Sequence, residues 1–314
     1  MNEALAGYLA CLADWEIMVS QSSYLLPENP DKNFYLLKCL HIWENMNQQT
    51  ISQGALYEQG RPVMKSMPIV YKKGPIFVHM LAKMMGEQNF QLAMQDYVNN
   101  YYLKTANHEQ LWEVMENQKP PILYDYNVSQ IFNSWIKQSG VPYLNVSRCY
   151  EDDCRNKLEF GQKEFSFNPD ATSTKTWNIP IRYSLVRYNE TDDKYVKQSG
   201  DPLRFLMMNK THIQYNIDTI GEKDALIVNS DHAGMYHVNY DETNWKNIGA
   251  VLHQDPKLIT PATRLQLAWL LRLSLEREEI RPSMVLCIGE YTKVTSALYL
   301  YNQCFFHISC SIIL

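Results

Sequence analysis

The spacing of apolar residues divides the chain into three parts. Over the first 140 residues, apolar side chains recur every three or four positions, which is typical of amphipathic helices. From Tyr143 to about Tyr240 they alternate with polar side chains, which is typical of strands. The helical spacing returns from about Asp241. We therefore expect an α+β chain of three domains, covering residues 1–140, 141–240 and 241–314.

Several helix N-termini can be predicted within the first 140 residues. Asn2 is the expected N-cap of a first helix, and a second is predicted to begin at Gly74-Pro75, because proline suits the first turn. A third is expected to be capped by Asn89, and Asn107 opens another with a capping box. The expected buried stripes contain Leu5, Tyr8, Leu9, Leu12, Trp15, Val19, Phe77, Met80, Leu81, Met84, Phe90, Ala93, Tyr97, Tyr101, Ile131, Phe132, Trp135 and Ile136.

The middle part predicts a small antiparallel β-sandwich. Its expected strands lie at residues 144–146, 158–167, 179–185, 213–217, 225–228 and 235–240. Beyond it, Pro261 lies near the first turn of a predicted helix whose apolar side includes Leu265, Ala268 and Trp269. A shorter helix is expected at residues 284–290, and the apolar tail 304–314 has no assigned place.

Composition narrows the class of protein. The chain has 314 residues, of which 46% are apolar, so it is expected to fold around a sizeable core. The net charge of −5 comes without a run of basic residues, which argues against a nucleic-acid partner. The chain starts without the basic and apolar pattern of a signal peptide, and no apolar stretch is long enough to cross a bilayer. A membrane anchor or export signal would therefore lie outside these residues.

Cysteines and glycosylation motifs bear on the compartment. Of the seven cysteines, Cys149 and Cys154 are close enough to bridge across a hairpin, whereas the others show no metal-type pairing. Four Asn-x-Ser/Thr sequons cluster in one stretch. This clustering favours a secreted or lumenal chain with glycosylation at Asn127, Asn145, Asn189 and Asn209.

Two residues could take part in chemistry. Glu3 lies in the first turn of a helix beside the small residues Ala6, Gly7 and Ala10, so another helix could approach its carboxylate closely. A carboxylate is a common third zinc ligand beside two imidazoles, although an acid in a first turn also simply favours the helix dipole. Tyr71 precedes a helix start, where its phenol could donate to a developing oxyanion or be a half-buried tyrosine whose hydroxyl is satisfied nearby.

Three histidines are rejected as metal ligands. His108-Glu109 begins like a His-Glu-x-x-His motif, but Trp112 occupies the fifth position. His232 and His237 are five residues apart in a strand-rich region, so their side chains are expected on opposite faces.

Five segments resemble motifs of the zinc aminopeptidases of the aminopeptidase N family, in the same order along the chain. Residues 2–8 resemble Asn-Glu-Gly-Phe-Ala-x-Tyr, and residues 70–74 resemble Ser-Tyr-x-Lys-Gly. Residues 107–112 resemble (Asn/Thr)-x-x-(Asp/Gln)-Leu-Trp, residues 135–142 resemble Trp-x-x-Gln-x-Gly-(Phe/Tyr)-Pro, and residues 234–241 resemble Gly-x-Tyr-Arg-Val-Asn-Tyr-Asp.

This resemblance implies a fold and two site residues. It implies the helical half of a thermolysin-like catalytic domain, a small β-sandwich and the start of a HEAT-type helical domain. It also implies that Glu3 is the third zinc ligand, that Tyr71 stabilises the tetrahedral intermediate, and that the substrates are peptides with a free N-terminus.

The chain departs from the family pattern in a decisive way. Two motifs of the family are not found in the chain and would precede Met1: His-Glu-x-x-His, with its two histidines and glutamate, and Gly-x-Met-Glu-Asn. Within the matched segments, Gly, Phe, Ser and Arg of the family pattern are replaced by Ala4, Leu5, Val70 and His237. One matched ligand cannot hold zinc, so this chain is expected neither to retain the metal nor to hydrolyse peptides alone. The alternatives are a non-catalytic chain that binds a peptide or a protein, and a gene-model fragment without a function of its own. The sequence indicates no oligomeric state.

Overall fold

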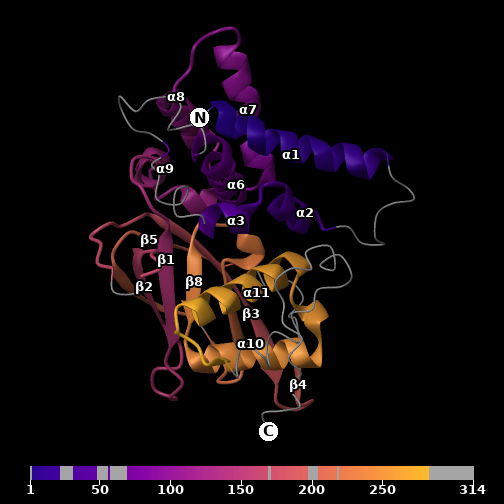
Figure 1. The fold of residues 1–314 in the computed structure, drawn as a ribbon, viewed down its shortest axis with the longest axis vertical. Coiled ribbons are helices and arrows are strands. Elements are labelled where there is room, and N and C mark those ends of the chain that lie inside the picture. The colour runs from indigo at the N-terminus through magenta and orange to yellow at the C-terminus, as the bar shows by residue number, and fades with distance from the viewer. Residues whose placement is uncertain are drawn as a thin grey trace.

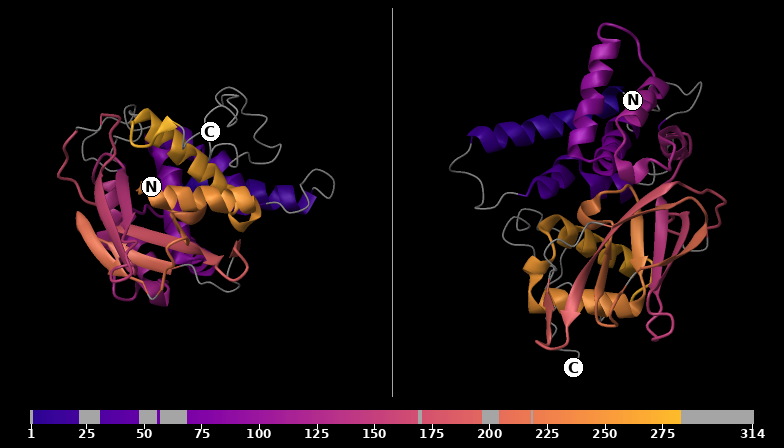
Figure 2. Two further views of the ribbon diagram at one scale, coloured as in Figure 1. Left: turned by 90° about the horizontal axis from the view of Figure 1, so that it is seen from below. Right: turned by 180° about the vertical axis from the view of Figure 1, so that it is seen from behind.

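The computed structural model describes residues 2–21, 31–47, 56, 69–168, 171–196, 204–217 and 219–282. Helices form one end of the molecule, strands follow, and two further helices pack beside the strands (Figures 1 and 2). The mixture of helix and sheet agrees with the expected α+β class. None of the helices in the described ranges is long and apolar enough to span a membrane.

Helix α6 (Gly74–Met85) forms the centre of the helical end. Every residue of α6 except Lys83 is buried, so the predicted stripe of Phe77, Met80, Leu81 and Met84 is confirmed but is only part of the buried surface. An aromatic cluster joins α6 to its neighbours: the Phe77 ring lies 6.0 Å from that of Phe132 and 6.1 Å from that of Trp112. The surrounding helices are α1 (Asn2–Gln21), α2 (Lys32–Cys39), α3 (Ile42–Asn47), α7 (Glu87–Tyr101), α8 (His108–Asn117) and α9 (Val128–Ile136).

The helix starts agree with the sequence in most cases. The capping box is present, since Asn107 accepts from the backbone of Gln110 and the Gln110 side chain accepts from that of Asn107. The Asn89 cap is wrong: α7 begins at Glu87, and the Asn89 side chain instead donates to the Gln118 carbonyl at 2.7 Å. On α1 the buried residues include Ala4 and Cys11, whereas Leu9 and Val19 of the predicted stripe are exposed.

The strands form two sheets. One has the order β6-β2-β1-β8, and in the other β3 pairs with β4, β5 and β7. All of these pairs are antiparallel except β1 with β8, which is parallel, so the expectation of a purely antiparallel sandwich is wrong at this pair. The bounds are β1 (Pro142–Arg148), β2 (Lys157–Glu164), β3 (Ile179–Asn189), β4 (Lys194–Val196), β5 (Arg204–Met208), β6 (His212–Asn216), β7 (Ala225–Val228) and β8 (His237–Tyr240).

Two helices complete the described fold. Helix α10 (Glu242–Gln254) is capped by Asp241 and contacts β7, and α11 (Pro261–Glu276) is capped by Thr260 and contacts β8. The predicted proline in the first turn of α11 is confirmed. The expected helix at 284–290 and the tail 304–314 lie outside the described residues.

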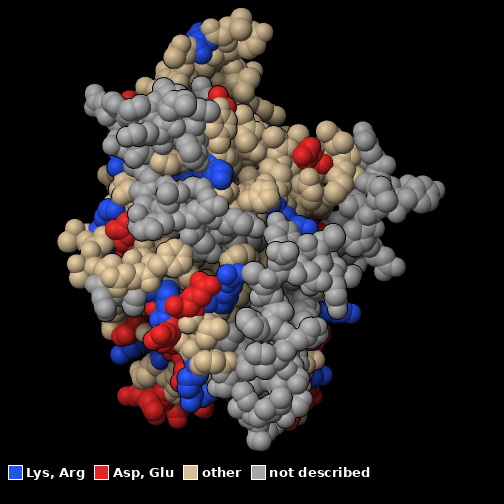
Figure 3. All heavy atoms as spheres, in the orientation of Figure 1, with Lys and Arg blue, Asp and Glu red and all other residues tan. Residues whose placement is uncertain are grey.

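Charged side chains are unevenly spread over the face seen in Figure 3. Lysines, arginines, aspartates and glutamates gather below the helical end and are interspersed with one another. The turn between β1 and β2 contributes the exposed acids at residues 151–153. The upper end of this face, where α1 and α7 lie, shows few charges.

Candidate functional site

The structure brings Glu3 and Tyr71 together, although 67 residues separate them. The side chains of Glu3 and Tyr71 lie close enough to interact, and this interaction is the main cause that raises the pKa of the Tyr71 phenol above its ordinary value. Both side chains are exposed, Tyr71 by 48%, so the pair lies at the protein surface. A phenol beside a carboxylate is a group able to donate to an oxyanion at the same place.

The contact depends on a close approach between two helices. A Cβ atom added to Gly7 of α1 would lie 2.8 Å from Cγ of Pro75, and one added to Gly74 would lie 2.6 Å from Cβ of Ala4. Real Cβ atoms do not come so close, so both positions require glycine or a shift of the helices. The close face of α1 therefore contains Ala4 and Gly7, whereas the expected Ala6 and Ala10 are exposed.

Tyr71, which was expected just before a helix start, lies in a π-helical turn. The turn η1 (Ile69–Lys73) leads directly into α6. Within it, Ile69 and Lys73 are buried, while Tyr71 and Lys72 point to solvent. Single π-turns of this kind are rare in proteins, and those that occur are often found at functional sites.

Lys73 is the residue of this region that the sequence analysis missed. Its side chain is only 2% exposed, and its Nζ donates to the Gly140 carbonyl at 2.7 Å. Burial lowers the pKa of the Lys73 ammonium to about 7, and the positive charge of Lys175 lowers it further, while Glu164 opposes the shift. The available signal was the lysine of the Tyr-x-Lys-Gly pattern itself.

The described residues do not fit a zinc ion. No group of three or more His, Cys, Asp or Glu residues within the described ranges could hold a metal. His79 is completely buried in α6, 6.0 Å from the Tyr8 ring, and burial lowers its pKa far below the ordinary value. His108 is the first residue of α8, as predicted. Glu3 is thus one carboxylate without two imidazoles beside it in the part of the chain that is described.

The other motifs maintain the fold around this pair. In α9, the Trp135 indole donates to the Asn178 carbonyl at 2.8 Å, and Gln138, just after the end of α9, donates to the Thr176 carbonyl at 2.7 Å. The Tyr240 hydroxyl accepts from the Val228 amide at 2.9 Å and donates to the Val228 carbonyl at 3.1 Å. These side chains join α9 and β8 to the second sheet, and none of these bonds involves the exposed Glu3–Tyr71 pair.

His237 occupies the position where the resembling motif has arginine. It is buried in β8, with its ring 4.4 Å from that of Phe165. Its pKa is lowered to about 3, chiefly by burial and then by the charges of His232 and Arg277. His232 is not on a strand but in a short 3₁₀ turn, η3 (Ser230–His232), where burial lowers its pKa to about 3.

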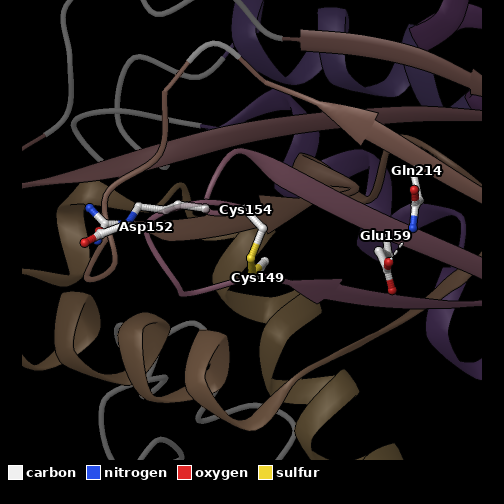
Figure 4. Close-up of a disulfide and its surroundings, with 6 residues drawn as sticks. Cys149, Asp152, Cys154, Glu159 and Gln214 are labelled. Carbon is white, nitrogen blue, oxygen red and sulfur yellow. Dashed lines mark hydrogen bonds and ion pairs between the residues drawn. A yellow bond between two sulfur atoms is a disulfide. The ribbon is translucent and has the colours of Figure 1, made fainter.

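Two disulfides are present in the described residues. The structure pairs Cys149 with Cys154 across the turn after β1, with Cα atoms 5.5 Å apart (Figure 4). A second disulfide, Cys11–Cys39, joins α1 to α2 with Cα atoms 6.0 Å apart. The sequence does not predict this second pair, because nothing in a spacing of 28 residues marks two helices as neighbours.

The four sequon asparagines differ in their surroundings. Asn127, Asn145 and Asn209 are exposed, and Asn209 directly follows β5. The Asn189 side chain is half-buried and donates to Asp192 at 2.9 Å while accepting from the backbone of Thr191 at 3.0 Å. Asn127, Asn145 and Asn209 are therefore more open to a glycan than Asn189.

Comparison with known proteins agrees with the motifs. Residues 45–135 match the Peptidase family M1 domain. The chain is 27% identical over 206 residues to glutamyl aminopeptidase of Sus scrofa, an alignment that covers 63% of this chain and 19% of that protein. It is 27% identical over 277 residues to aminopeptidase Q of Homo sapiens, covering 85% of this chain and 26% of that protein.

A third relative gives the same result. Aminopeptidase N of Bos taurus is 27% identical over 190 residues, which is 57% of this chain and 18% of that protein. The chain therefore spans about a fifth to a quarter of the length of these relatives, by the 19%, 26% and 18% that the alignments cover. The family match, which includes Tyr71, and the three aminopeptidase relatives agree with one another: residues 45–135 are similar to the Peptidase family M1 domain, and the chain is similar to a segment of known aminopeptidases.

Proposed function

We propose that this chain carries part of the active site of a zinc aminopeptidase that removes N-terminal residues from peptides. The observation that supports this proposal is the proximity of the Glu3 and Tyr71 side chains, because the family resemblance requires these two residues to face one place. In this proposal Glu3 is the third zinc ligand, and Tyr71 donates to the oxyanion that forms at the scissile carbonyl. Residues 1–140 then belong to a thermolysin-like domain, 141–240 to a β-sandwich and 241–314 to the start of a HEAT-type domain.

The chain alone is not proposed to be a working enzyme. The sequence contains no His-Glu-x-x-His, and the described residues do not assemble a metal site. Without further ligands from another segment, Tyr71 has no developing oxyanion to stabilise. The competing proposal is a non-catalytic chain that binds a peptide or a protein, and activity measurements distinguish the two.

The purified chain is expected to show no hydrolysis of an aminoacyl-anilide, with or without added zinc, because a catalytic zinc needs three protein ligands. The measurement is turnover with stoichiometric zinc, run beside Glu3→Ala and Tyr71→Phe. Zinc-dependent turnover that both substitutions abolish would show that the ligand count is wrong.

A chimera tests the positive half of the proposal. In it, residues of this chain replace the matched 206-residue region of porcine glutamyl aminopeptidase. Turnover of the substrate of the parent enzyme is expected, and Tyr71→Phe is expected to lower kcat by about 10²–10³. A chimera that folds, binds zinc and remains inactive would favour the non-catalytic alternative.

We also propose that the chain is located on the extracellular or lumenal side of a membrane. Disulfides persist in oxidising compartments, and Cys11–Cys39 and Cys149–Cys154 are both present. The exposed sequon asparagines agree with this location.

Asn209 is expected to carry a glycan when the chain is produced in a eukaryotic secretory host, because its side chain is exposed just after β5. The measurement is the intact mass before and after peptide-N-glycosidase treatment. Asn209→Gln should lose the mass of one glycan relative to the wild-type chain. Equal masses for the two proteins would contradict the expectation.

A further inference from the structure

The π-turn that contains Tyr71 also contains Lys73, whose side chain bonds to a different part of the fold. Tyr71 and Lys73 are both in η1, with Tyr71 directed to solvent and Lys73 directed inward. The Lys73 Nζ donates to the Gly140 carbonyl at 2.7 Å. Gly140 lies between the end of α9 and the start of β1, so one side chain joins the turn to the beginning of the sheets.

Gly140 is itself held firmly. Its φ of +92° is a conformation that side chains rarely adopt, and an added Cβ would lie 2.3 Å from Oε1 of Glu164. The same Glu164 oxygen accepts from Lys175 at 2.7 Å, and Lys175 also donates to Ser139 Oγ at 2.7 Å. The carbonyl that receives Lys73 is therefore part of a fixed cluster and not of a free loop.

The burial of Lys73 is costly and needs a reason. A lysine that is 2% exposed loses its hydration, and an apolar residue of similar length would avoid that loss. General stability therefore does not explain why a lysine stands here. What lysine adds is a long side chain with N–H donors that reach one defined carbonyl, and the ammonium form makes the stronger bond.

We propose that Lys73 is a positioning residue for Tyr71: its bond to Gly140 holds the π-turn so that the Tyr71 hydroxyl faces Glu3. This inference rests on the proposed function for its relevance to catalysis, since Tyr71 is the residue assigned to the oxyanion. Its structural part concerns the placement of a side chain and stands without any metal. The two parts are therefore tested by separate measurements.

The first measurement is NMR of the chain labelled with ¹³Cζ-tyrosine at one fixed pH, with the Tyr71 signal assigned by its loss in Tyr71→Phe. Glu3→Gln should shift this signal, because the group beside the phenol changes. Lys73→Met should produce a shift in the same direction, and Lys73→Arg should restore much of the wild-type position. Lys72→Met is the matched control, since Lys72 is in the same turn but exposed, and it should leave the signal in place.

The second measurement is amide hydrogen exchange in residues 69–73. Lys73→Met should speed this exchange roughly tenfold or more, as expected for the loss of one hydrogen bond to a charged group, while exchange in β1 and β2 stays as in the wild type. A residue that merely stabilised the fold would change the unfolding midpoint without moving the Tyr71 signal. An unchanged Tyr71 signal and unchanged exchange in folded Lys73→Met would overturn the proposal.

Activity of the chimera separates the two proposals. If the chimera is active, Lys73→Met should lower kcat toward the value of Tyr71→Phe with little change in KM, whereas Lys72→Met should not. If the chimera is inactive while Lys73→Met still moves the Tyr71 signal, the proposed function fails and the positioning role stands. An active chimera in which Lys73→Met keeps the full kcat overturns the positioning role.

Discussion

Lowering the pH from 7.5 to 4.5 is expected to remove about 5 kcal/mol from the free energy of unfolding through His232 and His237 alone. Both imidazoles are buried, and burial lowers their pKa values to about 3, against an ordinary value of 6.5. The folded protein therefore keeps them neutral at pH 4.5, whereas the unfolded chain protonates them.

The sign follows from the proton count. The stabilisation due to the neutral imidazoles is fully present above pH 6.5, falls as the pH drops below that value, and levels off near pH 3. Each histidine contributes about 1.4 kcal/mol per pH unit within this window. His79 acts in the same direction, because its pKa is also lowered by burial. The paired carboxylates Glu87 and Glu242 have lowered pKa values and lose their contribution only below pH 4.5, so their effect falls in a separate window.

The measurement is urea unfolding at pH 7.5, 6.5, 5.5 and 4.5. His237→Phe keeps an aromatic ring against Phe165 and should remove about half of the pH dependence that His232 and His237 share. A free energy of unfolding that is constant from pH 7.5 to 4.5 would contradict the assignment of these two imidazoles.

The local features of the fold could be predicted from the sequence, whereas several long-range features could not. The capping box at Asn107 and the proline at the start of α6 depend on neighbours in the chain, so they are readable without a structure. The parallel pairing of β1 with β8 joins Tyr143 to His237, and no local pattern specifies which strands become neighbours. Strands β4 and β5 were missed, and β4 is only three residues long, too short for alternation to be visible.

The same division applies to the site. Glu3 and Tyr71 were found through short motifs, and the small residues of α1 correctly indicated a close helix contact. Of the three residues expected on this face, Gly7 makes the contact, whereas Ala6 and Ala10 are exposed and Ala4 takes part instead. Lys73 was missed because a charged residue is ordinarily expected at the surface, and only the three-dimensional structure shows Gly140 as its acceptor.

Removal of the Cys11–Cys39 disulfide is expected to lower the free energy of unfolding by about 3.5 kcal/mol, from the chain-entropy relation for a 28-residue separation. The bond joins α1, which contains Glu3, to α2, so it limits how far the first helix can separate from the rest in the unfolded chain. Cys149–Cys154 closes a separation of only 5 residues, for which the same relation gives about 2 kcal/mol.

The comparison of the two pairs provides the control. Cys11→Ala with Cys39→Ala, and Cys149→Ala with Cys154→Ala, are each unfolded in urea beside the wild-type chain at pH 7.5. The variant without Cys11 and Cys39 should lose more stability than the variant without Cys149 and Cys154. Its unfolded ensemble should also be wider, so its free energy of unfolding should fall more steeply with urea concentration. A larger loss in the Cys149 and Cys154 variant would contradict the entropic argument. It would mean that the turn after β1 needs its disulfide to form, whereas packing of Ala4 and Gly7 against α6 is enough to hold α1 in place.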